Sequence, residues 1–144
     1  MLDSLVRSLR AQDWRLLAKR RPEQEPWTLQ DVLVHVTYWK ADVARFALGK
    51  RRPLGERGLG THEHNRLVFE TWRDREVADV LAYHRQVQED VMAALQEASE
   101  SWISGRERAP HWPADLDIHS AAHRVRDIGR ILAEAGVSSA RSSG

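Results

Sequence analysis

Apolar residues recur along the chain at the three- and four-residue spacing of an amphipathic helix. Strand-like alternation of apolar and polar positions does not appear, and neither does an internal repeat. The pattern is long enough in four places to predict a helix of several turns. The four predicted long helices cover residues 2–20, 28–49, 75–98 and 115–135.

Residues that favour turns and helix ends separate these segments. Thr28 and Asp31 form a capping-box pattern at the start of the second long helix, where each side chain can accept a backbone N–H. Glycine, proline and charged residues predict irregular structure over residues 50–60 and 99–114. A short helix is expected from residue 61 to about residue 72.

These elements predict an all-α fold. Amphipathic helices of this length in one small domain favour a four-helix bundle, here with an extra short helix before the third long helix. We expect the domain to cover residues 1–136, with Gly136 as the C-terminal cap of the last helix. Residues 137–144 offer little to pack and are predicted to form a flexible tail.

The amino-acid composition restricts the class of protein and the partners that can be expected. Of the 144 residues, 42% are hydrophobic and 30% are charged, which is typical of a globular protein. No apolar run approaches the roughly 20 residues of a membrane span, and no signal-peptide core is found, so we expect a cytoplasmic protein without a membrane partner. The net charge is +1 without a basic face, so no nucleic-acid partner is expected. The absence of cysteine excludes thiolate ligands and cysteine nucleophiles.

Three histidines suggest a metal site. His119 and His123 lie four residues apart, so both rings project from one face of the last predicted helix and can bind one ion. They lie at the edge of its apolar stripe, and a partly solvated face is the alternative interpretation. His35 lies inside the apolar stripe of the second long helix, where it can supply a third ligand or act as a hydrogen-bonded core residue.

The sequence also resembles a known family over nearly its whole length. The segment WTLQDVLVHVTYW, residues 27–39, is similar to the second helix of the DinB-like superfamily of metal-binding four-helix bundles, which includes mycothiol-dependent maleylpyruvate isomerase. In that superfamily a Trp-[Ser/Thr] helix start precedes a histidine about two turns later. The H-x-x-x-H of His119 and His123 resembles a motif of the final helix. The segment from His62 to Arg75 looks closer to the ClbS/DfsB branch.

The resemblance implies that His35, His119 and His123 bind a divalent metal, such as Zn, Ni or Fe, in a cleft where water or substrate completes the coordination. It implies a metal-dependent thiol S-transferase or hydrolase that acts on a small reactive compound, with a small thiol as candidate cosubstrate. The alternative is a ClbS/DfsB-like protein without metal that hydrolyses or sequesters a small electrophile. Because bundles of this superfamily often dimerise, a homodimer is expected.

Other residues are candidates for the pocket wall or for contact with the metal ligands. Trp39 is expected in the core, and Asn65 belongs to the ClbS-like segment. His62 and His64 are two positions apart on the predicted short helix, so their rings diverge and they are not expected to share an ion. The complete set of pocket candidates is His84, Trp39, Asn65 and Trp112.

Overall fold

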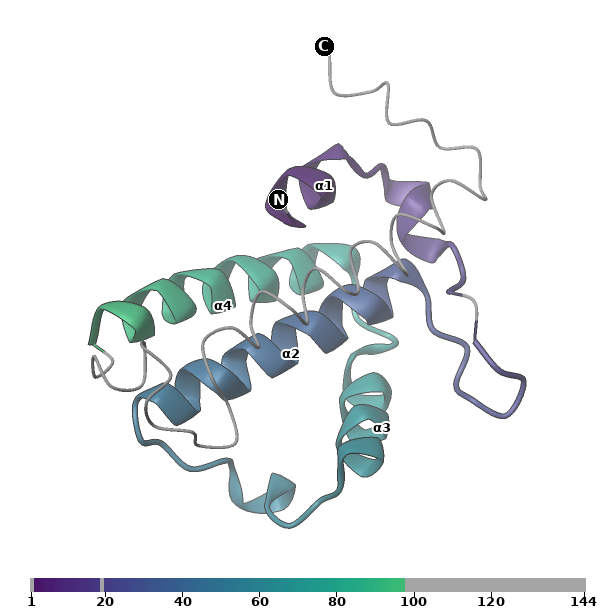
Figure 1. Cartoon of the computed structure of the whole chain (residues 1–144). Coiled ribbons are helices and arrows are strands. Elements are labelled where there is room, and N and C mark those ends of the chain that lie inside the picture. The colour runs from purple at the N-terminus through teal and green to yellow at the C-terminus, as the bar shows by residue number, and fades with distance from the viewer. Residues whose placement is uncertain (1, 19, 98–144) are drawn as a thin grey trace.

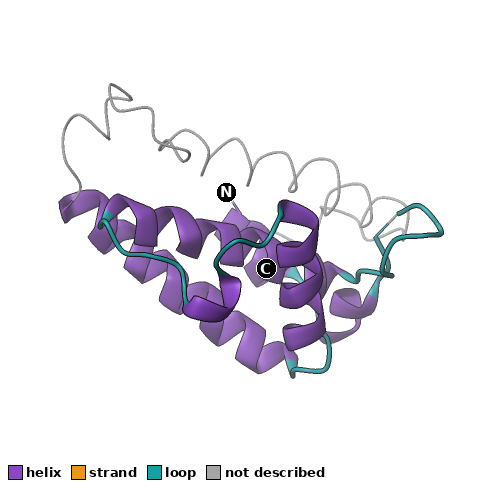
Figure 2. Ribbon diagram, turned by 90° about the horizontal axis from the view of Figure 1, so that it is seen from below, coloured by secondary structure: helices purple, strands orange, loops and turns teal. Residues whose placement is uncertain are grey.

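The computed structural model describes residues 2–18 and 20–97, most of which are helical (Figure 1). No β-strand occurs within these ranges (Figure 2), and Leu17 and Thr28 form an isolated antiparallel bridge. The predicted all-α class is confirmed for this part of the chain. Its elements in order are α1 (Leu2–Ser8), η1 (Ala11–Arg15), α2 (Leu29–Ala47), η2 (Leu54–Glu56), α3 (Thr61–Trp72) and α4 (Val77–Glu97), where η denotes a 3-10 helix.

Helices α2 and α4 lie side by side and run in the same direction (Figures 1 and 2). Residues later in α2 contact residues later in α4, as expected for parallel helices. Thr37 Oγ1 lies 3.4 Å from His84 Nδ1, and one turn later Lys40 Nζ donates to Gln88 Oε1 at 3.4 Å. Because α2 is about 28 Å long, the loop after it and α3 must carry the chain back before α4 begins. The short helix predicted before the third long helix is part of this return.

Helix α2 begins at the predicted capping box. Thr28 N donates to Asp31 Oδ2 at 2.8 Å, and Asp31 N donates to Thr28 Oγ1 at 3.3 Å. Burial raises the pKa of Asp31 above its ordinary value, while the hydrogen bonds that Thr28 N and Thr28 Oγ1 donate to its carboxylate oppose that rise. The helix ends before Gly49, whose φ of 67° is a conformation that glycine adopts without strain. Sequence and structure therefore agree on both ends of this helix to within two residues.

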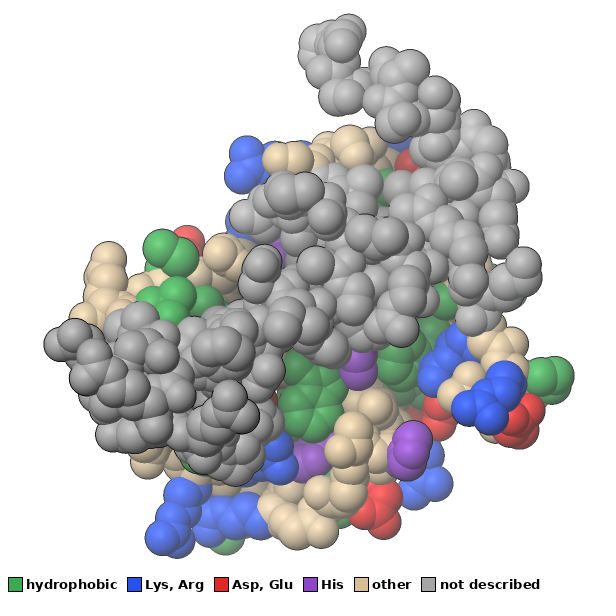
Figure 3. Space-filling model, viewed as in Figure 1, with side chains coloured by type: hydrophobic (Ala, Val, Ile, Leu, Met, Phe, Trp, Pro, Cys, Tyr) green, Lys and Arg blue, Asp and Glu red, His purple; other side chains and the backbone are tan. Residues whose placement is uncertain are grey.

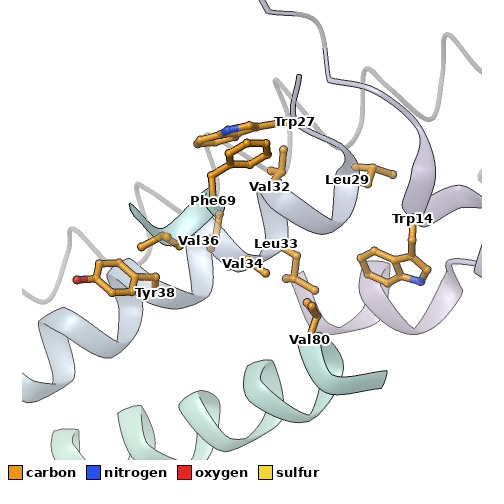
Figure 4. Packing of buried hydrophobic residues seen from close by; sticks show 11 residues of the cluster. Trp14, Trp27, Leu29, Val32, Leu33, Val34, Val36, Tyr38, Phe69 and Val80 are labelled. Carbon is orange, nitrogen blue, oxygen red and sulfur yellow. The ribbon is translucent and has the colours of Figure 1, made fainter. Parts of the chain in front are cut away.

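The core surrounds α2, because ten consecutive residues from Leu29 to Tyr38 are buried. A helix that is buried on all sides is the centre of its domain and not a surface element. Figure 4 shows Val80 of α4 pointing toward Leu33, with Trp27 and Phe69 next to Val32. A smaller cluster joins the other half of α2 to α4; it consists of Ala44, Val87, Val91 and Ala94.

The predicted long helix over residues 2–20 is wrong, since the structure has α1, then η1, then extended chain. Asp13 Oδ2 accepts the N–H of Arg10 at 2.8 Å, and such a local side-chain bond competes with a continuous helix. Trp14 is buried in the core, and Ala18 N donates to Trp27 O at 2.7 Å. Tertiary packing and this short backbone pairing therefore override the leucine spacing.

Other predicted elements agree with the structure or lie beyond its description. The short helix over 61–72 and the long helix over 75–98 are confirmed as α3 and α4. The loop over 50–60 is irregular apart from the single turn η2. The helix over 115–135 and the loop over 99–114 lie outside the described residues. Within the described part, every helix is too short or too polar to cross a membrane.

Candidate functional site

Aromatic and histidine side chains gather where α2 meets α3. We call this group, Trp27, His35, Tyr38, Trp39 and His64, the α2–α3 aromatic cluster. On the face shown in Figure 3, histidines (purple) lie beside hydrophobic side chains (green) over the region where these two helices meet. The cluster combines flat apolar walls with imidazole nitrogens, which is the composition of many small-molecule sites.

His35 lies between two indole rings. Its ring centroid is 5.0 Å from that of Trp27 and 6.5 Å from that of Trp39. Trp39 follows His35 by four residues on α2, so the two side chains share one helix face. His35 is only 8% exposed, and the neighbouring indoles restrict the orientations that its ring can take. Such a restricted orientation suits an imidazole that must direct a ring nitrogen at a ligand.

Trp39 lies at the centre of the cluster and is only partly buried. Its indole Nε1 donates to Asn65 Oδ1 at 3.0 Å, and its ring centroid is 5.7 Å from that of His64. The expectation that Trp39 belongs to the core is thus met only in part. Three predicted site residues, His35, Trp39 and Asn65, come together here, and the cluster reaches the surface at Trp39.

His64 was not predicted as a site residue, yet it is the most deeply buried histidine of the described chain, at 1% exposed. Its Nε2 is buried and has no hydrogen-bond partner among residues 2–18 and 20–97. The Nε1 of Trp27 is also buried and has no hydrogen-bond partner among these residues. The sequence does contain a signal for His64, since Val68 follows it by four residues on the apolar face of α3.

The loop after α2 contacts Tyr38 and Trp39 as well. Tyr38 Oη donates to Glu56 Oε2 at 2.6 Å. The guanidinium of Arg52 lies 5.7 Å from the centroid of Trp39 and donates twice to Asp42, from Nε at 2.9 Å and from Nη2 at 2.7 Å. These contacts fix the loop against α2 and complete the polar side of the site.

His84 does not join the α2–α3 aromatic cluster. It contacts Thr37, which lies two residues from His35 and so about 200° away around α2. His84 instead lines a separate pocket of about 580 Å³ between the N-terminal segment and α4, together with Trp14 and Leu81. His84 therefore lines a pocket, as predicted, but His35 does not belong to the described lining of that pocket.

The remaining predicted site residues, His119, His123 and Trp112, lie outside the described residues. Within the described part, no three His, Cys, Asp or Glu side chains form a group that suits a metal ion. His35 is therefore the part of the predicted triad whose surroundings are defined. It contributes one imidazole, in a mostly apolar environment.

The buried hydroxyl of Tyr38 makes stability sensitive to alkaline pH. Burial, followed by the bond to Glu56, raises the pKa of Tyr38 well above its ordinary value of 10.0. The stabilisation is complete below pH 10 and is lost as pH rises through the folded-state pKa. We expect the unfolding free energy to fall above pH 10, measured by urea denaturation, and to fall less steeply in Tyr38→Phe.

Tyr83 provides the comparison, because burial raises its pKa to about 12. Tyr83→Phe should also reduce the slope of the unfolding free energy against pH above pH 10. Of the two variants, only Tyr38→Phe also removes the hydrogen bond to Glu56. At pH 7 that loss should be about 0.5–1.5 kcal/mol. An unchanged alkaline slope in Tyr38→Phe would contradict the raised pKa.

The chain was compared with protein-family models, with curated proteins and with solved structures, and none of the three comparisons finds a match.

Proposed function

We propose that this protein binds a divalent metal ion through His35, His119 and His123, and that it is a metal-dependent thiol S-transferase or hydrolase. The observation that carries the proposal is the position of His35, buried on the central helix between the rings of Trp27 and Trp39. A neutral imidazole in such a place suits Zn, Ni or Fe. The proposal includes a DinB-like bundle in which residues 115–135 form the last helix.

The chain itself contributes binding and orientation in this proposal. When bound, the ion lowers the pKa of a water or thiol and so supplies a nucleophile to a chain that has no cysteine. Trp27 and Trp39 keep the His35 ring in place and exclude water from one side of it. Asn65 fixes the indole of Trp39 through the bond at 3.0 Å, which gives the substrate a defined apolar wall.

Metal analysis of protein purified without a histidine tag tests this proposal. We expect wild-type protein, exposed to Zn, Ni or Fe and then dialysed, to retain metal in proportion to protein. His35→Ala, His119→Ala and His123→Ala should each lose it. His84→Ala is the matched control, because it removes a buried histidine on the opposite side of α2, and it should retain the metal.

Two outcomes would overturn the metal proposal. One is wild-type protein that retains no metal, and the other is retention by a folded His35→Ala variant. Circular dichroism checks folding in each variant. Because His35 is buried, His35→Gln provides a second variant that keeps a polar side chain of similar size at this position.

One observation favours a second function, a metal-free protein that hydrolyses or sequesters a small electrophile. The buried Nε2 of His64 has no hydrogen-bond partner among the described residues and lies in the same aromatic cluster. In this proposal, an imidazole there acts as a general base toward a water molecule that enters the cluster with the substrate. Hydrolysis of styrene oxide to its diol is the probe. Metal-free wild-type protein should accelerate it, His64→Ala should not, and His62→Ala, which changes an exposed neighbour, should retain the activity.

A further inference from the structure

A pocket of about 580 Å³ lies where α2 ends and the following loop folds back against it. Its described lining includes no member of the α2–α3 aromatic cluster, but the Arg52 guanidinium joins the two regions, since it lies 5.7 Å from the ring centroid of Trp39. Four of its lining residues are cations: Lys50, Arg51, Arg52 and Arg57. In Figure 3, Lys and Arg side chains (blue) gather at the lower edge of the face, over the loop between α2 and α3.

The carboxylate in this lining is already neutralised. Asp42 is 3% exposed and accepts two hydrogen bonds from Arg52, at 2.9 and 2.7 Å. Arg45 Nη1 adds a third contact at 3.3 Å. Asp42 therefore has no negative charge left to offset the other cations of the pocket. In the part of the chain that the structure describes, Lys50 and Arg51 make no ion pair, so the pocket has an excess of positive charge.

The pocket is also partly preorganised. Arg57 Nε donates to the carbonyl oxygen of Arg52 at 2.8 Å, so its guanidinium is positioned by a residue that Asp42 anchors. Gly49 and Gly58 have φ values of 67° and 81°, and a Cβ at either position would meet no atom within 4 Å. There is thus open space beside the backbone at both turns, and a side chain at either glycine would occupy part of it.

Among the described lining residues, Phe46 provides the apolar side chain. Phe46, in the last turn of α2, is partly exposed and contributes an aromatic surface beside the cations. Guanidinium groups match the geometry of phosphate oxygens and form paired hydrogen bonds with them. An aromatic ring next to such groups suits a ligand that carries a flat apolar part.

We propose that this pocket binds a small organic phosphate monoester. Lys50, Arg51 and Arg57 contact the phosphate group, and Phe46 contacts the apolar part of the molecule. Arg52 is a positioning residue, because its Nε and Nη2 donate to Asp42 while its carbonyl oxygen orients Arg57. His35 does not line this pocket, so the phosphate proposal does not rest on the metal proposal.

Calorimetric titration with phenyl phosphate at low ionic strength tests the site. Wild-type protein should bind it saturably, more tightly than inorganic phosphate, which lacks the ring, and more tightly than benzoate, which lacks the phosphate. The double variant Lys50→Ala/Arg51→Ala should weaken phenyl phosphate about tenfold or more. Phe46→Ala should weaken phenyl phosphate but leave inorganic phosphate unchanged.

The matched control removes the same charge elsewhere. Arg66 and Arg73 are exposed residues near α3, outside the pocket lining, and Arg66→Ala/Arg73→Ala should bind phenyl phosphate as wild type does. Equal weakening in both double variants would overturn the proposal, because it would show a general effect of net charge. Absence of saturable binding to wild-type protein would overturn it as well. Benzoate binding as tightly as phenyl phosphate would overturn the assignment to phosphate.

Discussion

Replacing Leu33 with alanine is expected to lower the free energy of unfolding by about 2–5 kcal/mol. Leu33 is fully buried, at 0% exposed, and Val80 of α4 points toward it (Figure 4). The substitution removes apolar contacts and leaves a cavity between α2 and α4. The close-packed side chains around the cavity can relax only in part, so it is not filled. Urea denaturation followed by circular dichroism measures the loss.

A leucine in a different environment provides the control for this effect. Leu54, in the loop after α2, is 79% exposed, so Leu54→Ala should change the unfolding free energy by no more than about 0.5 kcal/mol. If Leu33→Ala cost as little as Leu54→Ala, α2 would not be the centre of the core. The pair thus tests the burial of α2 with the same chemical change.

Replacing Arg52 with alanine is expected to cost about 3 kcal/mol of unfolding free energy, because it leaves the buried carboxylate of Asp42 with a weaker set of contacts. Arg45 Nη1 lies 3.3 Å from Asp42 and compensates in part. The Arg52 side chain is 30% exposed, so solvent screens the pair, and the loss should lie toward the lower end for a broken buried ion pair.

A double-mutant cycle separates the pair from other effects of Arg52. Asp42→Ala/Arg52→Ala should be less destabilised than the sum of the two single variants, since removing both partners leaves no uncompensated buried charge. Strict additivity would show that the two residues do not interact. Arg66→Ala is a surface control, because its contact with Glu70, at 4.0 Å between exposed side chains, should contribute little.

The fold could be predicted from the sequence where local signals and tertiary packing agree. Thr28 and Asp31 determine the start of α2 through a pattern of two residues, and the structure has both hydrogen bonds. The N-terminal segment could not be predicted in this way. Its leucine spacing favours a helix, but Trp14 and the pairing of Ala18 with Trp27 depend on contacts with α2 that the local sequence does not contain.

The candidate site was predictable in part, for a similar reason. His35 and Trp39 share a helix face, so their proximity follows from helical spacing alone. Asn65 was identified from a resemblance, and the structure gives it a physical reason, the bond from the indole of Trp39. The partnership of Trp39 with His64 depends on how α3 crosses α2, and no periodicity within either helix determines that crossing.

The shared direction of α2 and α4 has a consequence for how this protein reaches its native state. Every contact between these helices joins residues far apart in sequence; the Thr37–His84 and Lys40–Gln88 contacts span 47 and 48 residues. Each such contact requires closure of a long loop before the packing energy is gained. This arrangement should therefore make folding slower than in a helical bundle whose packed helices are neighbours in sequence. A nascent chain cannot complete this core until α4 has left the ribosome.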